Sequence, residues 1–281
     1  MNRRKRILPR GWYPFDAKDC RNEIESYLAA WSPSQLPASG GRGGIIPHAG
    51  WYFSGKLAAR VFYSLKLKGE VEAIVLYGGH LSTEDVPRII TEEVWETPFG
   101  DVEIHVGLVE ALMKAVETRR ESLNSGDNTI EVQLALVKYF FPEAKLVGIR
   151  SPLSSKAEVL GKEVAEIARK AGISVLAIGS TDLTHYGPNY GFLEKGVGPT
   201  SVEWVKKEND KGFIDRALRM DAKGLLDHAL KNDSACSAGA AVSALATCKA
   251  LGSEKGILLD YYTSYDIMPD DSFVGYAGIL Y

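Results

Sequence analysis

Residues 173–185 read ISVLAIGSTDLTH, and this stretch decides the fold. Its first six residues are almost all apolar, which predicts a short strand buried on both faces, as in a sheet covered by helices. The strand runs directly into a polar segment that contains Asp182 and His185. Ligands of open α/β sheets bind outside the carboxyl ends of the strands. The stretch therefore predicts a buried sheet and one part of a site at its edge.

The rest of the chain alternates between extended and helical patterns in the same way. Residues 71–77 form a second apolar run, which ends shortly before His80, and residues 156–171 have the periodicity of a helix. Because no Pro/Ser-rich linker divides the chain, we expect one α/β domain over residues 1–281, with a mostly parallel or mixed central sheet flanked by helices. The other expected elements are a helix from a cap at Asp16 to about residue 31, strands at 45–46, 144–149, 257–263 and 274–281, a hairpin of 89–95 and 102–106, and helices at 54–65, 128–141, 202–230 (with a break near 220–221) and 239–251.

The composition is that of a globular protein without a strong charge bias. The 281 residues are 45% hydrophobic and 25% charged, with a formal net charge of −3. Nucleic-acid binders usually show a clustered basic excess, so we expect no nucleic-acid partner. The basic run at residues 2–6 is interpreted as a solvated tail. No stretch approaches the ~20 apolar residues of a membrane helix, and no apolar segment follows the basic start as in a signal peptide.

Three of the five histidines follow predicted strands. His48 comes after residues 45–46, His80 after residues 71–77 and His185 after residues 173–178. Strand ends that are distant in sequence can converge on one pocket, and neutral imidazole is a ligand for iron, copper and zinc. We interpret His105, in the predicted hairpin, and His228, on a predicted helix, as surface or packing residues.

The cysteines divide in a similar way. Cys236 directly precedes a predicted helix, where the positive end of the helix dipole favours the thiolate, which is both a nucleophile and a soft metal ligand. Cys248 fits a buried packing role, and Cys20 is assigned none. Three cysteines cannot form a disulfide framework, which favours a reducing compartment, the cytoplasm by default. The glycines in residues 40–44 lack phosphate-loop spacing and are interpreted as a flexible loop.

Several blocks of sequence together resemble the Memo family. They occur in the order typical of that family and span roughly residues 44–281. The blocks are PHAGWYFSG (47–55), WETPFGDV (95–102), TIEVQL (129–134), STDLTHYG (180–187), CSAG (236–239), YTS (262–264) and VGYA (274–277).

The resemblance implies a fold shared with class III extradiol ring-cleaving dioxygenases, which hold non-haem iron(II). It implies a metal pocket of His48, His80 and Cys236, with Asp182 and His185 as further pocket residues. Iron(II) or copper is the implied metal, and the His and Cys ligands would also suit zinc. Family members in prokaryotes are associated with AMMECR-type and radical-SAM proteins, which are therefore expected partners.

The chain departs from the family pattern at two positions. Leu81 and Asn128 stand where the family often has histidine. Asn128 can donate and accept hydrogen bonds but cannot act as a general base near neutral pH. Glu131 is either a carboxylate in or near the pocket, or a capping or salt-bridge residue on a helix.

These residues support three hypotheses about function. The first is a metal-dependent, dioxygenase-like oxidoreductase of unknown substrate, with His185 as acid/base and Asp182 orienting it or joining the metal ligands. The second is a non-enzymatic module that binds a peptide or small molecule. Its rim would include Trp51, Tyr52 and Tyr190. The third is a hydrolase with Cys236 as nucleophile and His185 or His48 as base.

Overall fold

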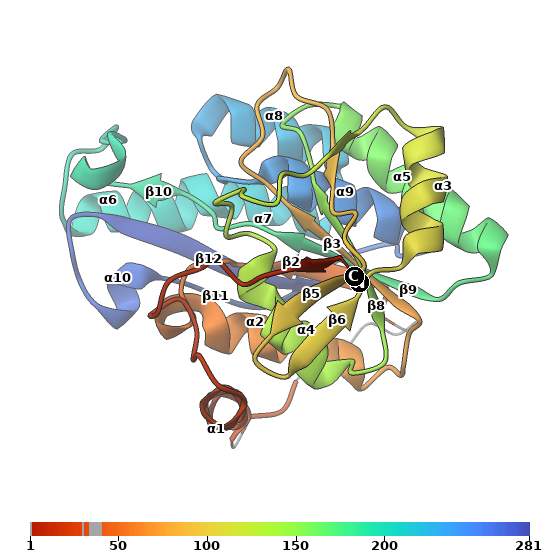
Figure 1. Cartoon of the computed structure of the whole chain (residues 1–281). Coiled ribbons are helices and arrows are strands. Elements are labelled where there is room, and N and C mark those ends of the chain that lie inside the picture. The colour runs from red at the N-terminus through yellow and green to blue at the C-terminus, as the bar shows by residue number, and fades with distance from the viewer. Residues whose placement is uncertain (1, 30, 34–40) are drawn as a thin grey trace.

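The centre of the fold is a mixed sheet whose middle strands are parallel. The computed structural model describes residues 2–29, 31–33 and 41–281. Within them the strand order is β10-β12-β2-β9-β3-β8-β4-β7, with β11 paired to β12 (Figure 1). The four middle strands β2 (Gly43–Ile46), β9 (Val175–Ser180), β3 (Ala73–Gly78) and β8 (Lys145–Arg150) run parallel to one another. Because they run parallel, their carboxyl ends lie at one edge of the sheet.

Antiparallel strands extend the sheet on both sides. Next to β2 lies β12 (Phe273–Leu280), which also pairs with β11 (Ile257–Thr263) and with β10 (His185–Tyr186). On the other side β4 (Arg88–Ile89) runs antiparallel to β8 and parallel to β7 (Arg119–Arg120). The mixed sheet predicted from the sequence is confirmed.

Helices cover both faces of the sheet. One face is covered by α9 (Ala238–Ala250), which contacts β9, β2 and β3, and by α5 (Lys156–Ala171), which packs against α9. The opposite face is covered by α2 (Trp51–Lys66), with α1 (Ala17–Leu28) and α4 (Leu134–Phe140) packed against it (Figure 1). The remaining helices in the described residues are α3 (Val106–Ala115), η1 (Glu131–Gln133), η2 (Pro188–Tyr190), α6 (Pro199–Trp204), the π-helix η3 (Val205–Asn209), α7 (Asp210–Leu218), α8 (Ala222–Asn232) and α10 (Ser264–Ile267).

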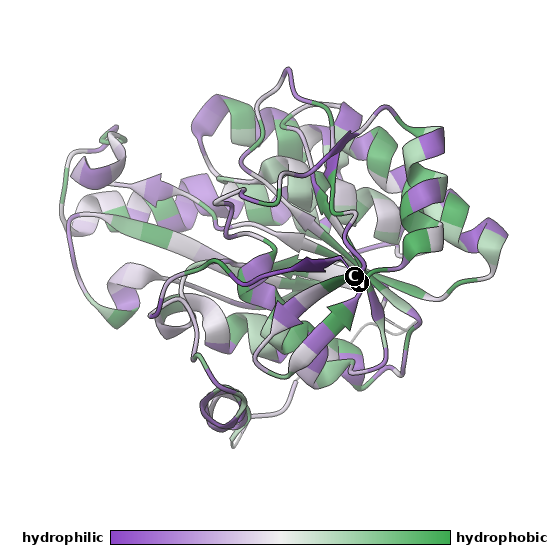
Figure 2. Ribbon diagram, viewed as in Figure 1, coloured by the Kyte–Doolittle hydropathy of each residue, from purple (hydrophilic) through white to green (hydrophobic). Residues whose placement is uncertain are grey.

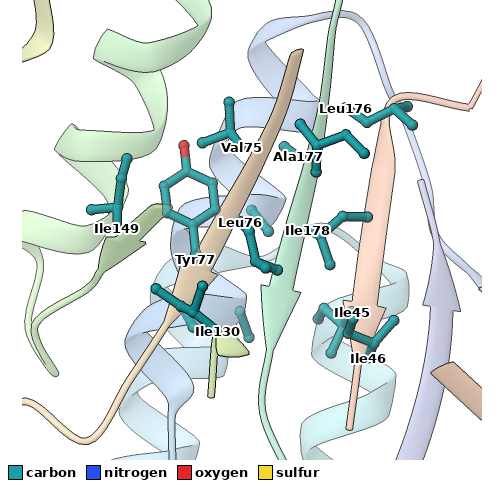
Figure 3. Packing of buried hydrophobic residues seen from close by; sticks show 14 of the residues in the cluster. Ile45, Ile46, Val75, Leu76, Tyr77, Ile130, Ile149, Leu176, Ala177 and Ile178 are labelled. Carbon is teal, nitrogen blue, oxygen red and sulfur yellow. The ribbon is translucent and has the colours of Figure 1, made fainter. Parts of the chain in front are cut away.

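The hydrophobic core lies between these layers. Figure 2 shows apolar residues along the middle strands, whereas the outer helices alternate between apolar and polar residues. All residues of β2, β3 and β9 are buried. Figure 3 shows side chains of these strands packed together, among them Ile45, Ile46, Val75, Leu76, Tyr77, Leu176, Ala177 and Ile178. In the described ranges, no helix has the length and apolar character needed to span a bilayer.

The basic run near the N-terminus is not a solvated tail, so that prediction is wrong. Strand β1 (Arg3–Arg4) pairs in parallel with β5 (Val94–Thr97), which forms a hairpin with β6 (Gly100–Glu103). Arg4 is only 3% exposed and forms an ion pair of 3.3 Å with Glu92. Glu92 compensates the charge of Arg4 inside the protein, which allows Arg4 to be buried, whereas Arg3 and Lys5 stay exposed.

Two further predictions are wrong. Residues 102–106 were expected to form a strand, but β6 ends at Glu103 and the helix α3 (Val106–Ala115) follows. His105 caps this helix, because its Nδ1 accepts a hydrogen bond from the Leu108 N–H at 3.2 Å.

The second wrong prediction concerns the glycines of residues 40–44. Gly43 and Gly44 lie within β2 rather than in a flexible loop, and residue 40 lies outside the described residues.

Candidate metal centre

The candidate site begins where three neighbouring strands end. β2, β9 and β3 are adjacent in the sheet. His48 follows β2 by two residues, Asp182 follows β9 by two residues and His80 follows β3 by two residues. Cys236 comes from the loop between α8 and α9. The register of the parallel strands therefore brings together side chains that are far apart in the sequence.

Two imidazoles and one thiol lie close enough to share a ligand. One possible ligand atom each from His48, His80 and Cys236 lies within 4.8 Å of the other two. The Cys236 Sγ is 3.2 Å from the His48 Nε2, and the two imidazole rings are 5.3 Å apart at an angle of 81°. His48 is buried, whereas His80 and Cys236 are partly accessible. His48 and His80 also line a pocket, and Cys236 lies next to it, with its Sγ against the His48 ring.

Asp182 and His185 lie beside this cluster. The Asp182 Oδ1 accepts hydrogen bonds from the backbone N–H groups of His48 at 2.6 Å and Ala49 at 3.3 Å. The Asp182 Oδ2 lies 3.9 Å from both His48 Nε2 and His185 Nε2, too far for a normal hydrogen bond. Among the described residues, the buried His185 Nε2 has no hydrogen-bond partner. Asp182 therefore orders the loop that carries His48 and interacts with both rings through its charge.

The electrostatics of the cluster favour a thiolate. Burial alone would raise the pKa of Cys236, but the three surrounding imidazoles outweigh it and hold that pKa well below its usual value. Burial alone would lower the pKa of His185, but Asp182 and the Cys236 thiolate raise it to about 10. Burial likewise opposes the charged form of His48, and Cys236 and Asp182 outweigh it, so its pKa is also raised. The thiolate is the form of cysteine that binds metals.

The donor set fits a transition metal. The Ser180 Oγ donates to the Thr129 carbonyl at 2.6 Å, which leaves it as the acceptor for His48 Nδ1 at 3.4 Å. His80 Nδ1 similarly faces the Asp127 Oδ2 at 3.1 Å. In both rings Nε2 is thus the nitrogen left to act as a ligand, the arrangement typical of metal-binding histidines. Two imidazoles and a thiolate suit iron, copper or zinc.

The pocket outside the cluster is lined mainly by aromatic and small polar side chains. It has a volume of about 430 Å³. Tyr190 contributes to its wall as expected, but Trp51 and Tyr52 do not, so that part of the predicted rim is wrong. Trp51 is buried against α1 and Tyr52 faces solvent. The lining residues are Trp12, His48, Ala49, Gly50, Phe53, His80, Asn128, Asp182, His185, Asn189, Tyr190, Ser264, Met268, Asp270, Ser272, Val274 and Tyr276.

Asn128 and Glu131, whose roles the sequence left open, lie in different environments. Asn128 lines the pocket, and its Nδ2 donates to the His48 carbonyl at 3.2 Å. Glu131 is buried away from the pocket, where it accepts hydrogen bonds from the Ile7 and Leu8 N–H groups and from the Tyr13 hydroxyl. Glu131 therefore anchors the N-terminal segment. That segment also contains Trp12, a pocket residue that the sequence analysis missed.

The remaining histidines and cysteines lie elsewhere. His228 lies in α8, and its Nε2 donates to the Asn209 carbonyl at 2.9 Å. Cys248 is buried in α9. Cys20 is also buried, and its Sγ donates a hydrogen bond to the Pro14 carbonyl at 3.0 Å. His228 is partly buried, as expected of a surface or packing residue, and the buried packing role predicted for Cys248 is confirmed.

Comparison with known proteins identifies the family. The sequence model described as "Memo-like protein" matches residues 6–280. A MEMO1 family protein of Pyrobaculum arsenaticum is 32% identical over 100% of this chain and 99% of its own length, and one of Desulfurococcus amylolyticus is 31% identical over the same shares. The crystal structure of an uncharacterized Escherichia coli K12 protein aligns with a TM-score of 0.44 and 15% identity, covering 79% of this chain and 91% of that chain. The chain belongs to the Memo-like protein family.

Proposed function

We propose that this chain is a metal-dependent oxidoreductase that uses iron(II) or copper. The observation that carries the proposal is the convergence of the His48, His80 and Cys236 ligand atoms within 4.8 Å, at a point where both histidines line a pocket. The thiolate form of Cys236 and the orientation of both imidazoles support it. When bound, such a metal would supply redox chemistry and Lewis acidity. Zinc suits the same donors but would supply only Lewis acidity.

The surrounding residues have complementary roles in this proposal. Asp182 fixes the His48 loop through two backbone hydrogen bonds. His185 lines the pocket, and its Nε2 has no hydrogen-bond partner among the described residues, so in this proposal it is the group that would exchange a proton with a bound molecule. Trp12, Phe53 and Tyr276 line the pocket with aromatic surface, against which an apolar part of the substrate would pack.

The pocket also limits the substrate. Its volume of about 430 Å³ suits a small molecule or one peptide side chain. Four aromatic residues line it, and none of its described lining residues is Lys or Arg, whereas Asp182 and Asp270 are acidic. Apart from the imidazoles, the lining offers an anionic group no compensating charge. We therefore infer that the part of the substrate that lies away from the imidazoles, near Asp270, is apolar and neutral or cationic.

Metal analysis tests the proposal. Protein purified without oxygen should bind one iron or copper ion per chain, and both His48→Ala and Cys236→Ser should reduce this to background. Cys248→Ala is the matched control, since this cysteine is buried in α9 away from the site, and it should bind metal like the wild type. Stoichiometric metal that survives both site substitutions would refute the assignment. Absence of metal together with saturable peptide binding would favour the non-enzymatic binding module instead.

One observation supports a second candidate, a cysteine-dependent hydrolase. The Cys236 Sγ lies 3.2 Å from the His48 Nε2, within reach for nucleophile activation. We rank it below both the oxidoreductase and the binding module, because three imidazoles surround the thiolate where one base would suffice. Rapid labelling of Cys236 by iodoacetamide that a substrate-like amide blocks, and that added metal does not, would support the hydrolase. Partnership with AMMECR-type and radical-SAM proteins and a cytoplasmic location stay predictions.

A further inference from the structure

His80 has an unusual backbone conformation. Its φ of +61° lies in the left-handed region, and only two other described non-glycine residues share a positive φ. This conformation is unfavourable for residues with a Cβ and persists only where the surrounding structure holds it. The conformation turns the chain sharply after β3, at the point where the imidazole enters the pocket. The contacts of His80 should therefore include the groups that hold this turn.

Arg150 holds the backbone of the turn. It is the last residue of β8, paired in register with Gly78 of β3, and it is 8% exposed. Its Nε donates to the Gly79 carbonyl at 2.9 Å, and its Nη2 lies 3.5 Å from the His80 carbonyl oxygen. Its Nη1 forms an ion pair with Glu121 at 3.1 Å. One buried guanidinium thus contacts both carbonyls next to the strained residue.

Asp127 holds the ring of the same residue. Its Oδ2 lies 3.1 Å from the His80 Nδ1 and 3.4 Å from the Arg150 Nε. Its Oδ1 accepts hydrogen bonds from the N–H and the hydroxyl of Thr129. Since a carboxylate can only accept, Nδ1 must carry the proton, and Nε2 is the nitrogen left for a ligand. Asp127 therefore selects both the rotation of the ring and the nitrogen that faces the cluster.

The same short segment also contacts the loop of the other imidazole. Asn128 donates to the His48 carbonyl at 3.2 Å. The Thr129 carbonyl accepts from the Ser180 Oγ, which in turn faces His48 Nδ1. The Thr129 hydroxyl accepts from the Gly79 N–H at 3.1 Å. Residues 127–129 thus connect the ends of β2, β3 and β9.

We propose that Asp127, supported by Arg150, is a positioning residue that presets the His80 Nε2 relative to Cys236, so that a metal ion meets an organised pair of ligands. This inference rests on the proposed metal site. It predicts that loss of the Asp127 charge weakens metal binding, although Asp127 is not itself a ligand. Partners of this kind on metal-binding histidines typically contribute about 10–100-fold to metal affinity.

The test is Co²⁺ titration of the reduced full-length protein under anaerobic conditions, followed through the thiolate-to-cobalt absorption band. Asp127→Asn keeps the shape of the side chain and should weaken Co²⁺ binding by about 10–100-fold while the thiolate band persists, because Cys236 is unchanged. Arg150→Lys keeps the charge but loses the branched donor, and should weaken binding in the same direction. Glu92→Gln is the matched control: it disrupts another buried ion pair, that with Arg4, which does not contact the site.

Thermal unfolding separates positioning from general damage. Glu92→Gln should lower the melting temperature but leave the Co²⁺ affinity within about twofold of the wild type. Wild-type affinity in both Asp127→Asn and Arg150→Lys, or an equal loss in Glu92→Gln, would overturn the inference and leave the metal site standing. Failure of the wild type to bind Co²⁺ would instead contradict the proposed function and, with it, this inference. If Asp127→Asn does not fold, Arg150→Lys alone decides the result by the same criterion.

Discussion

Arg4 shows how one buried charge holds the start of the chain in place. It forms an ion pair with Glu92, donates to the Ser122 carbonyl at 2.7 Å and stacks 4.7 Å above the Trp95 ring. Arg4→Ala leaves the Glu92 carboxylate buried without its counter-charge, which typically costs about 3–5 kcal/mol. Urea unfolding should show this loss. The control Lys5→Ala, at an exposed position, should change the free energy of unfolding by less than about 0.5 kcal/mol. Equal effects of the two substitutions would contradict the account of β1.

Asp210 gives the fold a dependence on pH. It is fully buried at the start of α7, where it accepts hydrogen bonds from Thr184 and, at 2.8 Å, from the Tyr261 hydroxyl. Burial outweighs these hydrogen bonds and raises its pKa to about 6. Between the ordinary carboxyl pKa of about 4 and pH 6, the folded state binds more protons here than the unfolded state. This group therefore stabilises the fold at low pH, and its contribution is lost as pH rises through 6.

Asp210→Asn should remove this contribution. As pH falls from 7 to 4, the free energy of unfolding of the wild type should rise relative to that of the variant, by about 3 kcal/mol at most. Denaturant unfolding at several pH values measures it. A difference that stays constant over this range would show that Asp210 does not bind a proton more readily in the folded protein.

At this scale the sequence predicted the residues that stand directly after strands. His48, His80 and Asp182 were found because a buried strand is recognisable from its apolar run and the sheet edge is a general ligand position. Cys236, by contrast, was assigned to the predicted metal pocket through the family resemblance. Asp127 and Arg150 were missed, because Asp127 lies in a polar turn-like stretch and Arg150 ends a strand. Their roles depend on contacts across the fold that no local pattern contains.

At the scale of the elements, the contact between α5 and α9 depends on small residues. A Cβ added at Gly161 in α5 would lie 2.3 Å from the Ser243 carbonyl oxygen of α9. Gly161→Ala should therefore lower the free energy of unfolding by about 1–3 kcal/mol, because the two helices must move apart. This effect opposes the better helix propensity of alanine, about 1 kcal/mol.

Gly107→Ala is the matched control for this prediction. Gly107 also lies in a helix, α3, but the nearest atom to its added Cβ is 3.7 Å away on the His105 ring. The same substitution should here stabilise the protein by about 0.5–1 kcal/mol. Denaturant unfolding of both variants should give opposite signs, and a shared sign would contradict the close packing of α5 on α9.

Long periodic elements were the ones predicted best from sequence. The bounds of α5 and β11 agree with the predicted ranges, and the break before α8 lies near Met220, where φ is +54°. Helix α3 was missed because the strand pattern of the hairpin was extended as far as Val106. Short strands such as β7 and β10 consist of two residues each, too few to show a period.

At the scale of the whole molecule, the site is a product of sheet topology. Strand β9 lies between β2 and β3, so the segments that carry His48, Asp182 and His80 become neighbours although more than 130 residues separate the first from the second. The loop before α9 adds Cys236 from the helical face. The order of strands could not be read from the sequence pattern, because each buried strand has a similar apolar composition.

X-ray absorption at the metal edge tests the shared coordination most directly. Protein loaded with one equivalent of Zn²⁺ should show one sulfur neighbour at about 2.3 Å and two imidazole nitrogens at about 2.0–2.1 Å. In Cys236→Ser the sulfur shell should be lost, whereas in Cys248→Ala it should remain. A bound ion without a sulfur neighbour in the wild type would contradict coordination by Cys236 and thus the central claim.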